Sequence, residues 1–335
     1  MIESSSSWFD LVPKAELHVH LEGAIPLEAL HELVRKYGGD ELLPDVEALR
    51  RKMVYRDFPH FLETWSWKNG FLREYDDFRR IGEAVARSFA AQNIRYAEAF
   101  FSPSDFFACG LETGRIAEAI RGGLARVPKV EVALVADLVR DHGPERGART
   151  LREAHEARTL GIVGIGIGGS EHAFPPEPFA PVFEEARRLG FRTTVHAGEG
   201  AGPESVWGAL RALRPDRVGH AVRAAEDPAL LDHLARSGIP LEMCPLSNVR
   251  SGIVRSLAEH PIRRFLDEGA TVTVSTDDPA MFGTSLATEF AELERVHGLD
   301  PAEVRGLLLR AIDASWLPGD RKERLAAEFV ADPHW

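Results

Sequence analysis

Apolar and polar positions divide the chain into two alternating kinds of segment. Short runs rich in β-branched residues are followed by longer stretches in which Leu, Ala, Glu and Arg recur with helical spacing, as in "FAPVFEEARRLG". Several of these stretches end in Gly, which is typical of helix C-termini. The strand-like runs are residues 15–20, 94–101, 130–138, 162–168, 192–196, 217–220, 240–244 and 271–275.

Eight strand–helix units predict the α/β class and a parallel (β/α)8 TIM barrel. The 335 residues suit this fold, since such barrels of about 250 residues or more fold as one unit. The segment between the first two strands is too long for one crossover. We therefore expect one domain over residues 1–335, with extra helices at about 26–90 forming a lid over the C-terminal mouth of the barrel.

Composition and charge narrow the class of protein. The formal net charge is −12, and an acidic chain lacks the basic patches that bind nucleic acid or anionic membranes. The start, "MIESSSSWFD", does not resemble a signal peptide, and no run approaches about 18 apolar residues. The two cysteines, Cys109 and Cys244, suggest neither a disulfide framework nor a Cys-rich zinc site. We expect a cytoplasmic protein with a small-molecule substrate.

The predicted strand ends carry groups that suit metal binding and acid–base chemistry. Active groups of such barrels gather at the C-terminal ends of the strands. Residues i and i+2 of a strand point the same way, so both imidazoles of the "HVH" sequence can face the mouth. The groups at four strand ends are His18 and His20, His196 and Glu199, His220, and Asp277 and Asp278.

Each of these motifs also has a purely structural explanation. A lone His-x-His in a strand is more often structural, and Asp278 before Pro279 could be only a helix N-cap. Their joint position on one barrel face favours a shared site. Three imidazoles and one carboxylate suit zinc, which activates water near neutral pH. We interpret the other nine histidines as surface or packing residues. Among them, His172 beside Glu171 is the best candidate for a role in the site.

The motifs "PKAELHVHLEGA", "TVHAGE", "VGH", "CPLSN" and "STDDPAMFG" resemble, in this order, the adenosine deaminase group of the amidohydrolase superfamily. The resemblance implies an enzyme with one zinc ion that replaces the 6-amino group of a purine with oxygen. A single metal is favoured because the fourth strand, "IVGIGIGGSE", has no lysine to bridge two metals. The implied zinc ligands are His18, His20, His196 and Asp277.

The same resemblance implies roles around the purine ring. Glu199 would donate a proton to N1, and His220 would orient the attacking water and help move its proton. Asp278 would bond N7, and the backbone N–H of Gly169 would meet N3. Such chemistry needs a nucleophile, a protonated ring nitrogen and a proton route to the leaving ammonia. The remaining implied substrate contacts are His20, Glu22 near the sugar, and Phe58 and Phe61 of the lid.

The substrate within this group has several candidates. Our main expectation is deamination of adenosine to inosine and ammonia. Free adenine is an alternative, because Ser170-Glu171 and "CPLSNV" resemble the adenine deaminase branch. A nucleoside altered at the 5′ position, such as aminofutalosine, is another, because Glu22 replaces the Asp that usually reaches the 5′-hydroxyl. A non-catalytic metal-binding barrel is disfavoured by the retention of Glu199 and His220.

Overall fold

A barrel of eight parallel strands forms the centre of the computed structural model, which describes residues 7–335. The expectation that the chain does not start with a signal peptide concerns residues 1–10, and most of these lie outside the described range. Each strand pairs with the next along the chain, and every strand agrees with its predicted range to within two residues. The strands are β1 (Lys14–His20), β2 (Ile94–Phe101), β3 (Glu131–Asp137), β4 (Ile162–Gly166), β5 (Arg192–Ala197), β6 (Arg217–His220), β7 (Leu241–Met243) and β8 (Val272–Val274).

The last strand returns to the first and completes the barrel. Val19 pairs in parallel with Asp277, which follows β8. The N–H of His20 donates to the carbonyl of Asp277 at 2.8 Å, and the N–H of Asp277 donates to the carbonyl of His18 at 3.0 Å. The predicted TIM barrel is therefore confirmed. Its seam joins two strand ends that carry candidate metal ligands.

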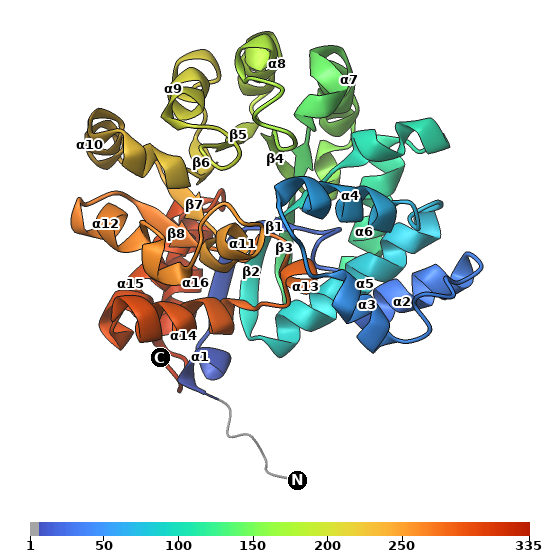
Figure 1. Cartoon of the computed structure of the whole chain (residues 1–335), viewed down its shortest axis with the longest axis horizontal. Coiled ribbons are helices and arrows are strands. Elements are labelled where there is room, and N and C mark those ends of the chain that lie inside the picture. Colours follow the sequence, from blue (N-terminus) through green and yellow to red (C-terminus); the bar gives the residue numbers. More distant parts are fainter. Residues whose placement is uncertain (1–6) are drawn as a thin grey trace.

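Helices form a ring outside the strands (Figure 1). Within residues 7–335 no helix is both long and apolar enough to cross a membrane. The helices of the ring are α5 (Tyr75–Ala91), α6 (Thr113–Leu124), α7 (Gly143–Glu156), α8 (Ala180–Arg188), α9 (Pro203–Ala212), α10 (Pro228–Ser237), α12 (Ile262–Asp267) and α15 (Pro301–Ala314). The additional helices are α1 (Trp8–Leu11), α2 (Leu27–Lys36), α3 (Val46–Lys52), α4 (Phe58–Asn69), α11 (Pro245–Arg250), α13 (Pro279–Phe282), α14 (Leu286–His297) and α16 (Gly319–Val330).

The long segment after β1 contains helices of two kinds. Helix α5 packs against α6 and β2, as the regular crossover helix of the first unit does, so the extra helices are α2, α3 and α4. Helix α4 starts where the Asp57 carboxylate accepts a hydrogen bond from the N–H of His60, with Pro59 in the first turn. One face of α4 lines the central cavity described below. The expected lid range of about 26–90 thus contains most of the crossover helix α5 as well as the extra helices.

The barrel interior contains a buried chain of charged side chains. The guanidinium of Arg217, at the start of β6, lies 2.5 Å from the carboxylate of Glu98 and 2.6 Å from that of Glu242. It also stacks on Trp316, 3.7 Å from the ring centre. The other carboxylate oxygen of Glu242 lies 2.9 Å from Nδ1 of His18. The chain therefore connects the N-terminal end of the barrel to the strand end that carries the site.

Replacing Arg217 with Ala should destabilise the protein by roughly 3–5 kcal/mol, because two buried carboxylates lose their partner. Urea unfolding followed by circular dichroism measures this loss. The matched control is Arg87→Ala, which removes an exposed ion pair with Glu83 and should change the free energy of unfolding by about 1 kcal/mol or less. Equal small effects in both variants would contradict the structural role of the buried pair.

Candidate active site

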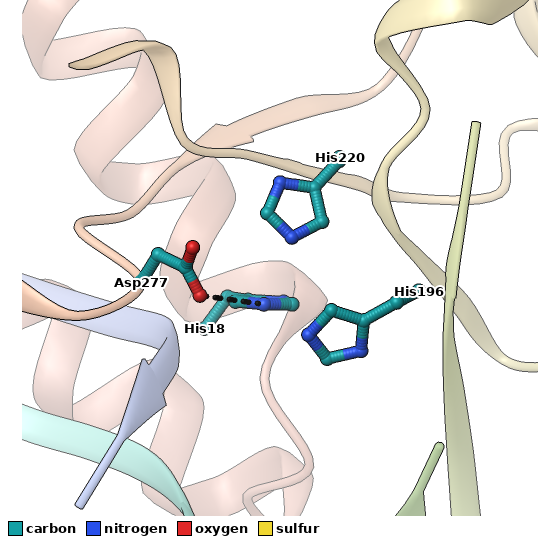
Figure 2. Close-up of side chains that lie close together, drawn as sticks. All are labelled: His18, His196, His220 and Asp277. Carbon is teal, nitrogen blue, oxygen red and sulfur yellow. Dashed lines mark ion pairs between the residues drawn. The ribbon is translucent and has the colours of Figure 1, made fainter. Parts of the chain in front are cut away.

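Four side chains meet at the C-terminal mouth of the barrel (Figure 2). They are His18 of β1, His196 of β5, His220 of β6 and Asp277 just after β8, and each offers one potential ligand atom within 4.8 Å of all the others. All four are buried. The sequence therefore identified strand ends that the barrel brings together, and the cluster could hold a metal ion.

His20 reaches the same cluster. Its Nε2 lies 3.1 Å from Nε2 of His196 and 3.3 Å from Oδ1 of Asp277. Nε2 of His18 lies 3.6 Å from the same carboxylate oxygen. Ligand atoms arranged tetrahedrally at about 2.0–2.1 Å from a zinc ion are separated by roughly 3.3–3.4 Å. The spacing of the donor atoms in His18, His20, His196 and Asp277 thus fits the ligand set that the resemblance implies.

Outer hydrogen bonds orient the cluster. Nδ1 of His18 pairs with Glu242 at 2.9 Å, and Nδ1 of His196 pairs with the carbonyl of Ile167 at 3.0 Å. With these nitrogens donating, the Nε2 lone pairs are free for a metal, as is usual for metal-bound histidines. Nε2 of His18 is buried and has no hydrogen-bond partner within residues 7–335. The hydroxyl of Ser247 donates to Oδ2 of Asp277 at 2.6 Å and leaves Oδ1 facing the histidines.

The electrostatics of the mouth act in different directions on the members of the cluster. Burial acts to lower the pKa of His18, but the nearby carboxylates of Asp277 and Glu242 raise that pKa to about 10. Burial lowers the pKa of His196 well below its usual range. Burial acts to raise the pKa of Asp277, yet the nearby imidazoles of His18 and His20 hold it well below its usual range. A bound cation would satisfy both the carboxylate and the unpaired imidazole nitrogens.

Two neighbouring carboxyl groups behave differently. Burial, followed by the charge of Asp277, raises the pKa of Glu199 well above its usual range. The same two causes raise the pKa of Asp278 to about 8. Both groups can therefore carry a proton near neutral pH, as general acids must.

The backbone is strained where the site is built. His220 and Asp277 have φ values of 60° and 64°, in the left-handed region that is unfavourable for residues with a side chain. The packing at Gly23 is equally restrictive, because a Cβ there would lie 1.6 Å from Oδ1 of Asp278. The "HLEGA" motif thus needs glycine so that Asp278 can approach β1.

Glu171 holds the loop that presents Glu199. Its carboxylate accepts four backbone N–H bonds, from Gly198 at 2.6 Å, Glu199 at 3.0 Å, Gly200 at 2.7 Å and Ala201 at 3.0 Å. Glu171 is buried, whereas the adjacent His172 is exposed. The sequence indicated His172 beside Glu171 as a pair of interest. In the structure the Glu171 carboxylate supports the site, and the His172 imidazole does not.

A cavity of about 440 Å³ opens above the cluster. It has the size of a small-molecule site. The predicted contacts His20, Phe58, Phe61, Gly169 and Asp278 line it, as do Glu199 and His220. Trp65 of the same aromatic lid segment lines it too, and additional lining residues that the sequence did not indicate include Asn69, Asp105, Asp137, Asp141 and His142.

Glu22 is not among the residues that line the cavity. It is fully buried, and one carboxylate oxygen accepts the N–H of Ser102 at 2.9 Å. Lys68 of α4 donates to the backbone carbonyl of Glu22 at 2.8 Å. These contacts place Glu22 between β1, the end of β2 and the lid, so its predicted contact with a sugar has no support from the cavity lining.

Several residues of the site were missed. His142 was interpreted as a surface or packing residue, but it lines the cavity, and its Nε2 lies 2.9 Å from Asp105. Glu242 and Arg217 were missed because a charged residue within an apolar run does not reveal its partner. The sequence feature that could have identified them is a charged residue inside a strand whose other residues are apolar and therefore predicted to be buried.

Fold and site together define a barrel hydrolase of the amidohydrolase type, with a candidate metal-binding cluster at the strand ends. The adenosine deaminase family model matches residues 13–332, and the chain belongs to this family. It is accordingly a hydrolytic deaminase.

Curated relatives refine this assignment. The chain is 38% identical over 324 residues to an aminodeoxyfutalosine deaminase from Streptomyces avermitilis, covering 95% of this chain and 90% of the relative. It is 36% identical over 324 residues to an adenine deaminase from Streptomyces coelicolor, covering 96% and 94%. Both relatives are matched over nearly their whole length.

Solved structures agree with the fold. An adenine deaminase from Arthrobacter aurescens superposes with a TM-score of 0.89 at 30% identity, covering 95% of this chain and 98% of that one. An amidohydrolase from Burkhoderia ambifaria with bound Zn superposes with a TM-score of 0.87 at 28% identity, covering 98% and 94%.

Purified protein should contain about one equivalent of divalent metal, measured by plasma mass spectrometry. Asp277→Asn should lose most of this metal, because the amide is a poor ligand in place of an ionised carboxylate. The matched control is the neighbouring Asp278→Asn, which should retain it. If Asp278→Asn lost the metal and Asp277→Asn kept it, Asp278 would be the metal ligand in place of Asp277.

Proposed function

We propose that this protein catalyses the zinc-dependent hydrolytic removal of the 6-amino group from an adenine-containing substrate. The observation that carries the proposal is the convergence of the metal-binding cluster, Glu199, His220 and Asp278 on one cavity. The zinc-containing structural neighbour supports the identity of the metal. His18, His20, His196 and Asp277 would hold the ion, which when bound makes water nucleophilic near neutral pH.

The chain's own residues supply the proton transfers. Glu199 is buried on the cavity and has a raised pKa, so it can deliver a proton to purine N1 and make C6 more electrophilic. His220 lies beside it, with Nε2 3.6 Å from the Glu199 carboxylate, in position to orient the attacking water. Asp278 lines the same cavity, and its raised pKa lets its carboxyl group stay protonated and donate a hydrogen bond to N7. The lid excludes water from the reaction.

A 5′-modified adenine nucleoside is the substrate class that we favour. The cavity lining also includes the polar residues Asn69, Asp105 and His142, which have no part in the purine contacts described above and are available to a sugar or a 5′ substituent. The aminodeoxyfutalosine deaminase relatives support this class. Adenosine itself, our main expectation from the sequence, has less support from the relatives' names.

Free adenine is the second candidate. Adenine deaminases reach the same level of identity to this chain, and the Ser170-Glu171 pair resembles that branch. The 440 Å³ cavity is also large enough for a free base.

Glu199→Gln should keep the bound metal and reduce kcat by roughly 10²- to 10⁴-fold, because the amide cannot deliver the proton to N1. Loss of the absorbance of the 6-aminopurine measures turnover, and metal analysis verifies loading. The control is Glu204→Gln in the first turn of α9, on the same connection, which should behave as wild type. Near-normal turnover by Glu199→Gln would show that another group protonates the ring.

A substrate panel separates the candidates. We expect kcat/KM to be highest for a 5′-modified adenine nucleoside, lower for adenosine and lowest for adenine. Phe58→Ala should reduce kcat/KM for the nucleoside by about 10-fold, equivalent to ~1.4 kcal/mol, and affect adenine little. Phe71→Ala is the matched control, because Phe71 packs on Trp67 of the lid and does not line the cavity. A preference for adenine that Phe58→Ala leaves unchanged would support the second candidate.

A further inference from the structure

His220 is the end of a buried chain of hydrogen bonds that passes through two residues without an assigned role. The chain starts at the backbone N–H of Ile262, which meets Nδ1 of His260 at 3.2 Å. Nε2 of His260 lies 3.3 Å from Oδ1 of Asn248. Nδ2 of Asn248 lies 3.1 Å from Nδ1 of His220. His220, Asn248 and His260 are all buried.

The donor and the acceptor of each hydrogen bond in this chain can be deduced from the first bond, between Ile262 and His260. A backbone N–H can only donate, so Nδ1 of His260 must be the accepting, unprotonated nitrogen. Burial, with a smaller contribution from His297, lowers the pKa of His260 to about 3, so the ring is neutral and carries its proton on Nε2. That N–H donates to Oδ1 of Asn248, and the amide must therefore present its Nδ2 donor to His220.

We propose that Asn248 and His260 are positioning residues that fix His220 in its Nε2–H tautomer. Nδ1 of His220 accepts the amide hydrogen, so a neutral ring keeps its one proton on Nε2, the nitrogen that faces the site. In this state His220 can donate a hydrogen bond to the attacking water but cannot take the water's proton. That proton must pass to a group other than His220.

The tautomer also distinguishes His220 from the candidate metal ligands His18 and His196. Nε2 of His220 has no lone pair to offer a metal when it carries the proton. Nδ1 of His18 and of His196 instead face a carboxylate and a carbonyl, which leaves their Nε2 atoms as ligands. The candidate ligands His18 and His196 thus lie beside a histidine, His220, whose ring is held in the opposite tautomer.

The "CPLSN" motif acquires a physical meaning from this arrangement. It forms the start of the short helix α11, which follows β7 directly. Ser247 donates to the carboxylate of Asp277, and the next residue, Asn248, donates to His220. Two adjacent side chains therefore fix one candidate ligand and the water-orienting group.

Nitrogen NMR of histidine-labelled, metal-loaded protein tests the tautomer directly. The His220 signals are assigned by their loss in His220→Gln. In the wild type we expect Nε2 protonated and Nδ1 unprotonated. Asn248→Asp is nearly isosteric, but its carboxylate can only accept, so Nδ1 of His220 should become protonated. A protonated Nδ1 in the wild type, or an unprotonated Nδ1 in Asn248→Asp, would overturn the proposal.

A pair of variants at position 260 separates the hydrogen-bond chain from simple packing. His260→Gln keeps an N–H donor for Asn248 and should retain wild-type kcat and the Nε2–H tautomer of His220. His260→Leu removes the donor, frees the amide to turn, and should lower kcat by about 10-fold or more with little change in KM; in serine proteases a wrong histidine tautomer costs about 10⁴-fold. Equal activity of the two variants would refute the role of His260.

Only the kinetic comparison rests on the proposed deamination. If no 6-aminopurine is turned over, the proposed function fails, while the NMR result still decides the tautomer. Metal analysis and thermal unfolding of each variant verify that the protein is loaded and folded.

Discussion

The ionised carboxylate of Glu242 is the interaction on which the site depends. It is fully buried on β7, where burial opposes its charge, yet Arg217 and the hydrogen bonds from His18 and Thr194 hold its pKa below the usual range. To stay ionised while buried, this carboxylate needs a cation beside one oxygen and a hydrogen-bond donor beside the other. The barrel supplies Arg217 from β6 and Nδ1–H of His18 from β1. The orientation of a candidate metal ligand is therefore set by the charge balance of the barrel interior.

The arrangement explains why the interior of this barrel is not purely apolar. A buried ion pair is often no more stabilising than a well-packed apolar group. Here the charged chain ends at an imidazole whose outward nitrogen must remain unprotonated to bind a metal. Its contribution is better understood as orientation than as stability, since the barrel already has a large apolar core around β1–β8.

Sequence patterns were sufficient for the barrel and for most of the strand-end groups. Buried parallel strands produce short apolar runs whose ends are recognisable, and the position of an active group at a strand end follows from the fold. The lid boundary was less certain, because α5 has the same periodicity whether it belongs to the insert or to the outer ring. The role of Glu22 stays a prediction: its place after "HVHL" suggested a contact with substrate, and in the structure its carboxylate accepts a hydrogen bond from the N–H of Ser102.

Residues that support the site through a partner were beyond prediction from the sequence. His260 and Asn248 are separated by a turn and a short helix, and neither has a spacing that marks it as functional. Glu171 was noticed for its similarity to one branch of the family. Its four backbone partners become visible only when β4 and β5 are placed side by side. Such roles depend on contacts between strand ends, which periodicity does not encode.

The seam between β8 and β1 has a consequence for how an ion would exchange with solvent. Asp277 closes the barrel through its backbone and faces the histidine cluster through its side chain. Opening of the two backbone bonds that join the ends of the sheet would therefore displace Asp277 and loosen the hold on an ion. Local opening at the seam, which has its own free energy within a folded protein, would then be one route of ion release.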